Sequence, residues 1–372
     1  MRRAAFVYDD ALSRHVYRPD HPLKPVRYRY TYELLEAYGV FKLENTELVA
    51  PGEATDDDLR LVHDPEYVEA VKSLSRGERR YNPARYNFSE WGDNPVFPGM
   101  YDASKLVVGA SLKAAELVVE GTFSVAFNIA GGLHHAMPDR ASGFCIFNDP
   151  AIVIAHLVNR GYRVAYIDID AHHGDGVQYI FYGTDRVLTI SIHESGRFLF
   201  PGTGDVQEIG TGRGRGYSVN IPLAPYTDDE TWLWAFDQVV PPLIEAFRPD
   251  IVVAQLGVDS HRDDPLTHLA LTTYGFIEAV RRIIRLSPRL VALGGGGYNL
   301  SVVPRAWALA YAEFGGFELP DDIPAQFHGL VGRRLRDPLP NPLPEKLGAD
   351  IRAFARASVE LVKQLIFPIH GL

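Results

Sequence analysis

The chain contains 372 residues, of which 46% are hydrophobic and 23% are charged, and these proportions are typical of a globular protein with a large core. Its net charge of −10 argues against general nucleic-acid binding, which requires a basic surface. The single cysteine, Cys145, excludes an intramolecular disulfide. Without an apolar run of about 18 residues or a signal-peptide pattern, the sequence predicts a cytoplasmic protein that does not cross a membrane.

Segments with strand character alternate with segments with helix character along the chain. The expected strands cover residues 5–8, 123–127, 163–169, 187–193, 217–222, 251–257 and 290–293. The expected helices cover residues 104–120, 151–160, 177–181, 228–247, 274–286, 302–314 and 350–366. This alternation predicts a mainly parallel sheet with helices on both faces. Because no internal repeat or low-complexity linker interrupts it, we expect residues 1–372 to form a single α/β domain.

Residues 77–99 form a long connection without a periodic pattern. Connections of this length are usually functional or disordered. The segment contains Tyr81, Tyr86 and Trp91. This aromatic content indicates an ordered loop at the surface.

The most informative stretch is residues 164–178, where polar side chains follow an apolar strand. Asp168, Asp170 and His172 occupy alternate positions, and alternate side chains of an extended chain lie on one side. Two carboxylates and an imidazole are costly to bury together unless they bind a cation, and both groups are common zinc ligands. An isolated Asp-x-Asp would more often be a hydrogen-bonded strand end. The His-His-Gly-Asp-Gly sequence that follows Ala171 favours a metal site instead.

Three further polar segments each follow an expected strand. They are the pair His134-His135, the segment that contains Asp259, and Tyr298 after a run of four glycines. In an open α/β sheet, ligands bind beyond the carboxyl ends of the strands. We therefore expect these segments and the 164–178 stretch to form one cleft.

A zinc hydrolase uses about three protein ligands and leaves one position open for water. Asp170 and His172 can supply two ligands and Asp259 the third, although an aspartate at that position would on its own more often cap a helix or a turn. The activated water needs a base, and the neutral imidazole of His134 or His135 suits that task. In isolation, such a histidine pair would more often be a satisfied core or turn pair.

The remaining polar and aromatic residues of these segments can complete such a site. Asp168 and Asp175 are the carboxylates left to orient the two histidines. The glycines before Tyr298 lack the spacing and the lysine of a phosphate-binding loop, so we expect them to aim the phenol inward, where it can donate to an oxyanion. Phe144 and Phe200 flank glycine or proline turns; most phenylalanines are core residues, but beside a metal cleft they would form the walls of an apolar channel.

Together these motifs resemble the histone deacetylases and their bacterial relatives, most closely the acetoin utilization deacetylase branch. The matching stretches run in the family's order over nearly the whole chain. They are His21-Pro22-Leu23-Lys24-Pro25, Gly132-Leu133-His134-His135-Ala136, Ser142-Gly143-Phe144-Cys145, Asp168 to Gly176, Phe200 to Gly204, Gln255 to Asp259, and Gly294 to Asn299. The resemblance implies a single arginase-like α/β domain around an eight-stranded parallel sheet.

The resemblance also implies a role for each matching residue. It implies one Zn²⁺ bound by Asp170, His172 and Asp259. It implies catalytic roles for His135 as base, His134 as its electrostatic partner, Tyr298 as the group that polarises the carbonyl, and Asp168 and Asp175 behind the histidines. It implies substrate contacts at Asp93, Gly143, Phe144, Phe200 and Leu266. A structural K⁺ site is implied at Asp168, Asp170, His172, Ser191 and Ile192.

The expected reaction is hydrolysis of an N-acetyl amide, with ε-acetyl-lysine of a protein or peptide as substrate and an acetylated acyl-CoA synthetase as the partner that the acetoin branch implies. The nearest alternative is an acetylpolyamine amidohydrolase. An arginase-like enzyme with two manganese ions would need more ligands than the sequence offers, and a non-enzymatic acetyl-lysine reader would be expected to lack Tyr298 or a metal ligand. The sequence leaves open whether Zn²⁺ or Fe²⁺ is bound and which oligomer forms.

Overall fold

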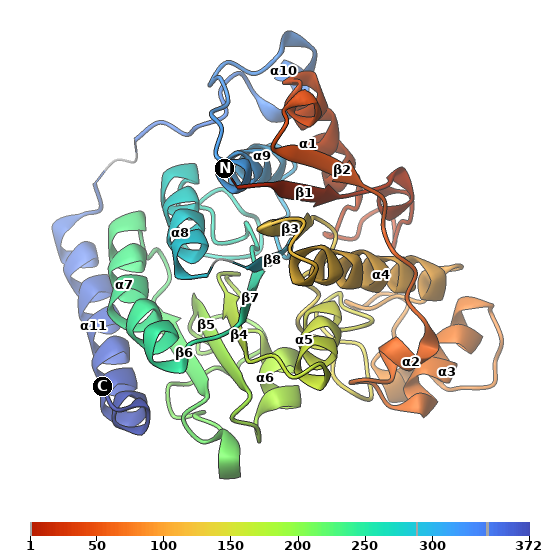
Figure 1. Ribbon diagram of the computed structural model, residues 1–372, viewed down its shortest axis with the longest axis horizontal. Coiled ribbons are helices and arrows are strands. Elements are labelled where there is room, and N and C mark those ends of the chain that lie inside the picture. The colour runs from red at the N-terminus through yellow and green to blue at the C-terminus, as the bar shows by residue number, and fades with distance from the viewer. Residues whose placement is uncertain (1, 288, 340–341) are drawn as a thin grey trace.

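The computed structural model describes residues 2–287, 289–339 and 342–372, and its centre is a sheet of eight parallel strands (Figure 1). The strands are β1 (Ala4–Val7), β2 (Thr46–Val49), β3 (Val125–Asn128), β4 (Val164–Asp168), β5 (Val187–Glu194), β6 (Ser218–Leu223), β7 (Ile251–Gln255) and β8 (Leu290–Leu293). Their order across the sheet is β2-β1-β3-β8-β7-β4-β5-β6. Every residue of β3, β4, β7 and β8 is buried, as expected for parallel strands that are covered on both faces.

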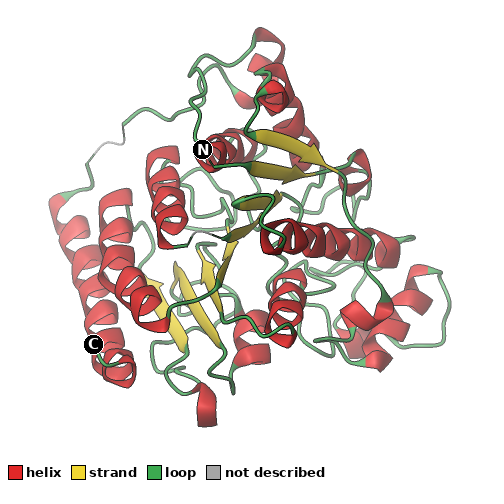
Figure 2. Ribbon diagram, in the orientation of Figure 1, coloured by secondary structure: helices red, strands yellow, loops and turns green. Residues whose placement is uncertain are grey.

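Helices cover both faces of this sheet (Figure 2). They are α1 (Val26–Ala37), α2 (Asp56–Leu59), α3 (Pro65–Ser75), α4 (Met100–Val119), α5 (Asp149–Asn159), α6 (Asp175–Phe181), α7 (Asp229–Phe247), α8 (Thr273–Leu286), α9 (Val303–Gly315), α10 (His328–Val331) and α11 (Glu345–Ile366). Short 3₁₀ turns cover Asp10–Ser13, Val40–Lys42, Pro83–Tyr86, Gly212–Gly214, Ala325–Phe327 and Phe367–His370. Helices α4, α5 and α6 lie on one face, while α1, α7, α8 and α9 lie on the other (Figure 1). Helix α11 packs against β6 and α7.

The predicted parallel α/β sheet with helices on both faces is confirmed. Strand β2 and helices α1, α2, α3 and α10 were not predicted. Strand β2 lies at the sheet edge, and only Thr46 of its four residues is buried, so it lacks the apolar run that marks the inner strands. Among the helices of the described residues, none combines the length and the apolar character needed to cross a membrane.

The path of the chain after β4 differs from the prediction. The strand ends at Asp168, whereas extended structure was expected to bring Asp168, Asp170 and His172 to one side. Instead, the Asp168 carboxylate accepts a hydrogen bond from the backbone N–H of Asp170 at 3.1 Å, and the Asp170 carboxylate accepts one from that of His172 at 3.0 Å. Aspartate favours such turns because its side chain bonds to the backbone two residues further on. Two successive turns, rather than strand alternation, thus orient these side chains.

The ordered loop expected over residues 77–99 is present, with a 3₁₀ turn at Pro83–Tyr86. Tyr86, Phe88 and Phe97 are buried, whereas Trp91 is exposed. The buried aromatic side chains anchor the loop to the body of the protein and leave its tip at the surface.

Candidate active site

The four predicted polar segments follow β3, β8, β7 and β4, and these strands are consecutive neighbours in the sheet. Because the strands are parallel, their carboxyl ends lie at one edge. The His134-His135 pair, Tyr298, Asp259 and Asp170 therefore extend from neighbouring strand ends.

Asp170, His172 and Asp259 are buried and offer ligand atoms that lie within 4.8 Å of one another. Nδ1 of His172 lies 3.1 Å from Oδ1 of Asp170 and 2.9 Å from Oδ2 of Asp259. Among the described residues, this is the one group of three potential metal ligands. This group can hold one metal ion.

The surroundings of this triad suit a divalent cation. Oδ2 of Asp170 accepts hydrogen bonds from Gln255 Nε2 at 2.6 Å and from the Gly296 N–H at 2.8 Å. Oδ1 of Asp259 accepts one from the Ala171 N–H at 2.8 Å. Burial and the charge of Asp170 raise the pKa of Asp259. Burial alone would lower the pKa of His172, but its hydrogen bonds to both carboxylates raise it well above its usual range. Protons held within this group thus offset the negative charge of its carboxylates, and a divalent ion bound by the same atoms would replace them.

The His134-His135 pair lies beside the triad, with the two Nε2 atoms 3.0 Å apart. Nδ1 of His134 lies 2.7 Å from Asp168, and Nδ1 of His135 lies 2.7 Å from Asp175. Burial would lower the pKa of His134, but the charges of Asp168 and Asp170 raise it to about 9. Burial, and then the charge of His134, lower the pKa of His135 to about 4. At neutral pH the pair therefore combines a charged imidazole with a neutral one that can accept a proton.

Two residues that the sequence interpretation missed position the histidine loop. The Asp149 carboxylate accepts hydrogen bonds from the N–H groups of Gly132 at 3.0 Å and Leu133 at 2.9 Å. Asn148 Nδ2 donates to the carbonyl of His134 at 3.1 Å. The Asn-Asp-Pro sequence at the start of α5 is a helix-cap signal, but its bonds to the histidine loop become visible only in three dimensions.

The glycine run brings Tyr298 to the same site. Gly295 and Gly297 have φ values of 140° and 129°, which residues other than glycine rarely adopt. The Tyr298 N–H donates to the Asp264 carboxylate at 2.8 Å, and the tyrosine ring packs edge-on against Phe144 with centroids 5.7 Å apart. The glycines permit close backbone approach to the carboxylates of Asp170 and Asp259, and no phosphate-binding geometry is needed to explain them.

Aromatic rings line the approach to the histidines. The ring of Phe200 packs edge-on against His135 with centroids 5.1 Å apart, and Phe200 is 43% exposed. A Cβ at Gly143 would collide with the His135 ring, so this position requires glycine. Leu266 is partly buried, and Asp93 is exposed on the 77–99 loop. Of the five predicted substrate contacts, Asp93 and Phe200 are exposed, and Gly143, Phe144 and Leu266 are partly buried.

A small cavity of about 20 Å³ continues inward from the histidines and Tyr298. Arg27 lines it and donates hydrogen bonds to the carbonyls of Gly295 at 2.7 Å and Gly297 at 2.6 Å. Cys145 also lines it, and burial raises the pKa of its thiol. The sequence interpretation did not place Arg27 in the site, because a single arginine in α1 carries no spacing signal.

The residues of the predicted K⁺ site lie on two neighbouring strands and the turn after β4. Asp168 pairs with Ser191 in the register of β4 and β5, and Ile192 follows Ser191. The Ser191 hydroxyl lies 2.8 Å from Nδ1 of His193. This placement brings the five residues to one region of the sheet.

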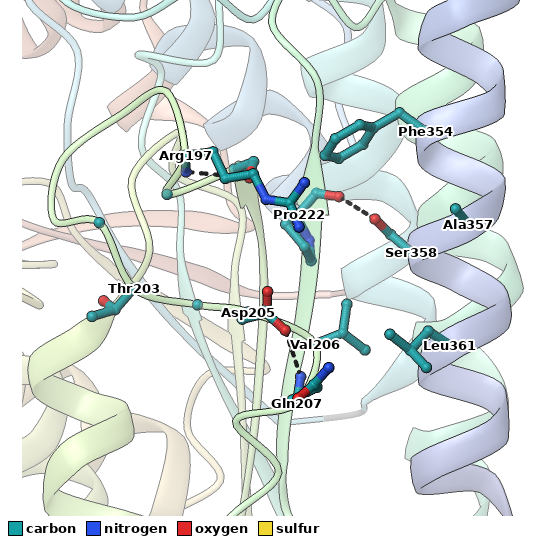
Figure 3. Close-up of a pocket in the computed structure, with 14 residues that line it drawn as sticks. Arg197, Thr203, Asp205, Val206, Gln207, Pro222, Phe354, Ala357, Ser358 and Leu361 are labelled. Atoms are coloured by element: carbon teal, nitrogen blue, oxygen red, sulfur yellow. Dashed lines mark hydrogen bonds between the residues drawn. The ribbon is translucent and has the colours of Figure 1, made fainter.

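A larger cavity of about 360 Å³ lies between β6, α11 and the loop that also carries Phe200 (Figure 3). Arg197, Pro222 and Leu361 are among its lining residues. It contains none of the residues predicted to act in catalysis, metal binding or substrate binding. The predicted residues His134, His135 and Tyr298 line the smaller cavity at the strand ends instead.

A parallel α/β sheet that places a buried Asp-His-Asp group beside a histidine pair defines a metal-dependent hydrolase. The histone deacetylase domain model matches residues 21–314. The chain belongs to the histone deacetylase family, which is metal-dependent, and it is a deacetylase.

Similar proteins support this assignment over most of the chain. The acetoin utilization protein AcuC of Bacillus subtilis is 41% identical over 334 residues, which are 88% of this chain and 86% of that protein. AcuC of Staphylococcus aureus strain MSSA476 is 42% identical over 313 residues, 82% of this chain and 80% of that one. The crystal structure of a histone deacetylase homologue from Aquifex aeolicus has a TM-score of 0.88 and 30% identity, and the match covers 97% of this chain and all of that one. The crystal structure of a histone deacetylase homologue complexed with SAHA has a TM-score of 0.87 and 31% identity, and the match covers 96% of this chain and all of that one.

Proposed function

We propose that the protein removes the acetyl group from ε-acetyl-lysine in protein substrates and releases acetate. The observation that carries the proposal is the neighbourhood of a buried Asp-His-Asp group, a charged and a neutral imidazole, and Tyr298 at the inner end of an aromatic approach. The approach is lined by Phe144 and Phe200, whose rings suit the apolar stem of a lysine.

The proposed metal is Zn²⁺, with Fe²⁺ as the alternative, held by Asp170, His172 and Asp259. When bound, such an ion supplies Lewis-acid polarisation of the acetyl oxygen and acidifies a water molecule. The proposal is supported by the donor set, because two carboxylate oxygens and one imidazole nitrogen are a common zinc environment. We also propose a structural K⁺ bound by Asp168, Asp170, His172, Ser191 and Ile192.

In the proposed mechanism, Nε2 of His135 accepts a proton from the attacking water, and Tyr298 Oη donates to the oxyanion that forms on the acetyl group. His134 holds positive charge beside the reacting atoms, and one of the two histidines then protonates the leaving amine. Asp168 and Asp175 keep the Nδ1 atoms of the histidines protonated and their Nε2 atoms facing the reaction. The support is the pair of short contacts at 2.7 Å and the opposite pKa shifts of the two imidazoles.

The proposed substrate contacts are Phe144 and Phe200 on the lysine stem, Gly143 beside them, and Leu266 and Asp93 at the mouth. A carboxylate at Asp93 can accept hydrogen bonds from the two N–H groups that flank an acetyl-lysine. An acetylpolyamine lacks these groups. Because the AcuC relatives are named acetoin utilization proteins, we propose an acetylated acyl-CoA synthetase as one substrate, which would place the protein in the cytoplasm. We also propose that residues 1–372 act as a single domain.

Acetate release from acetyl-lysine peptides and from acetylputrescine tests this proposal. The peptides should have the higher kcat/KM, and Asp93→Ala should lower it by about tenfold or more, since charge-assisted hydrogen bonds contribute roughly 1.5–3 kcal/mol each. Asp139→Ala is a matched control, because Asp139 is also an exposed loop aspartate and pairs with the neighbouring, exposed Arg140. Faster hydrolysis of acetylputrescine, together with an unaffected Asp93→Ala enzyme, would assign the protein as an acetylpolyamine amidohydrolase instead.

A further inference from the structure

The loop that carries Asp93 is fixed at its tip by the N-terminal segment. Arg18 Nη1 donates hydrogen bonds to the carbonyls of Glu90 at 2.9 Å and Gly92 at 3.3 Å. Its guanidinium also lies over the exposed Trp91 ring, 5.8 Å from the ring centroid. A long surface loop would otherwise be among the more mobile parts of the molecule.

His21 makes the next contact with this loop. It is 1% exposed, and its Nδ1 accepts a hydrogen bond from the Leu23 N–H at 3.1 Å. Nε2 must therefore carry the proton, and it lies 3.0 Å from the carbonyl oxygen of Asp93, to which it donates. Both ring nitrogens are satisfied in the neutral imidazole, so the ring orientation is fixed.

The same imidazole also supports the wall of the substrate channel. The Phe144 ring packs edge-on against it with centroids 4.6 Å apart, and Tyr17 stacks on it at 4.7 Å. Tyr17 Oη donates to the Phe144 carbonyl at 2.9 Å. Phe144 has a φ of 69°, a left-handed conformation that persists only when its surroundings hold it. His21 thus contacts both the backbone of the rim carboxylate and the ring of the channel wall.

We propose that His21 is a positioning residue that fixes Asp93 relative to Phe144, and that this spacing sets the preference for acetyl-lysine within a peptide. The inference rests on the proposed function, in which Phe144 contacts the lysine stem and Asp93 the flanking backbone. A peptide must make both contacts at once, so an untethered rim loop has to be ordered during binding, and this weakens affinity. A substrate without flanking amides uses only the channel and does not depend on the spacing.

A double-mutant cycle tests this role. His21→Ala, Asp93→Ala and the double variant are assayed with an acetyl-lysine peptide and with acetylputrescine. We expect His21→Ala to lower peptide kcat/KM about fivefold to tenfold, mainly through KM. Acetylputrescine kcat/KM should fall by a clearly smaller factor, because Phe144 keeps the hydrogen bond from Tyr17 and the contact with Tyr298. If His21 acts through Asp93, the double variant should be no worse than Asp93→Ala alone.

The outcomes separate this inference from the proposed function. If the two losses multiply in the double variant, His21 does not act through Asp93 and the inference is overturned, while the proposed substrate stands. If Asp93→Ala leaves peptide turnover unchanged, the proposed substrate contact fails and the inference fails with it. An equal loss on both substrates in His21→Ala would indicate a general structural role and would also overturn it.

Three further variants test whether the effect of His21→Ala is specific to its contact with Asp93. His21→Gln should restore most peptide turnover, because a side-chain amide can accept from Leu23 and donate to the Asp93 carbonyl. His370→Ala is the matched control: its Nε2 also bonds to a backbone carbonyl, that of Gly216 at 2.8 Å, and its ring packs edge-on against Tyr217 at 5.0 Å. Peptide-selective loss in that control would count against the inference. If His21→Ala does not fold, Arg18→Ala replaces it in the cycle, with the same non-additivity expected.

Discussion

At the scale of single residues, the role of Tyr298 can be separated experimentally from that of the proposed metal ligands. Its backbone is held by Asp264 and its ring by Phe144, so Tyr298→Phe should keep the ring in place and remove only the hydroxyl. Loss of one oxyanion donor typically lowers turnover by about 10²–10³. We expect that loss in kcat with unchanged metal content, measured by acetate release and metal analysis. Normal turnover would make the tyrosine structural.

The two histidines differ in the property that a base needs, which is neutrality at working pH. Burial and the neighbouring charge on His134 lower the pKa of His135 to about 4, so the His135 ring is neutral above that pH and protonated below it. We expect kcat/KM to fall on the acid side with an apparent pKa below about 6.5, the ordinary value for histidine. His135→Ala should lose most activity, and its residual rate should lack this acid limb. A limb retained in His135→Ala would move the base to another group.

At the scale of elements, Asp337 ties the segment after α10 to the start of α8 and to α9. Its carboxylate lies 2.7 Å from His261 Nε2 and accepts hydrogen bonds from the Thr273 N–H and Arg305 Nη1, each at 2.9 Å. Burial would raise the pKa of Asp337, but the hydrogen bond and charge of His261 outweigh it and lower this pKa. The stability that the carboxylate contributes is therefore present above the unfolded pKa of about 4 and is lost as pH falls through the lower folded pKa.

We expect Asp337→Asn to reduce the free energy of unfolding by about 1.5–3 kcal/mol at neutral pH, measured by urea titration. The difference from the unsubstituted protein should shrink as the pH falls below about 4. Asp321→Asn is the control, because Asp321 is more exposed and pairs with Arg334 and Arg336 near the surface, where such pairs contribute about 0–1 kcal/mol. Equal losses in the two variants would contradict this account.

The strands and turns also show which parts of the fold the sequence could predict. The inner strands were predicted because burial on both faces requires uninterrupted apolar runs, as in β4 and β7. The edge strand β2 was missed because exposure removes that signal. After β4, the sequence predicted a longer strand where the structure has turns. Side-chain-to-backbone hydrogen bonds of Asp168 and Asp170 form these turns, and such bonds leave no periodic pattern in the sequence.

At the scale of the whole molecule, the sheet order explains why the site could be predicted in part. Segments rich in histidine, aspartate or glycine mark the strand ends, but only the order β3-β8-β7-β4 makes them neighbours. Residues that reach the site from distant segments of the chain carried no such mark. Arg27 reaches the glycine run from α1, and His21 reaches Asp93 across 72 positions of sequence. Topology, rather than composition, places such residues.

The same topology predicts that the metal contributes to global stability. The proposed ligands come from the segments after β4 and β7, which are adjacent near the middle of the sheet. An ion that binds the folded chain and not the unfolded one adds about 2.7 kcal/mol when its free concentration is a hundred times Kd. We expect thermal unfolding of metal-free protein to shift upward with added Zn²⁺, and Asp259→Asn to lose the shift. Asp263→Asn, at an exposed position, should keep it. A shift of equal size in Asp259→Asn would place the stabilising ion elsewhere in the molecule.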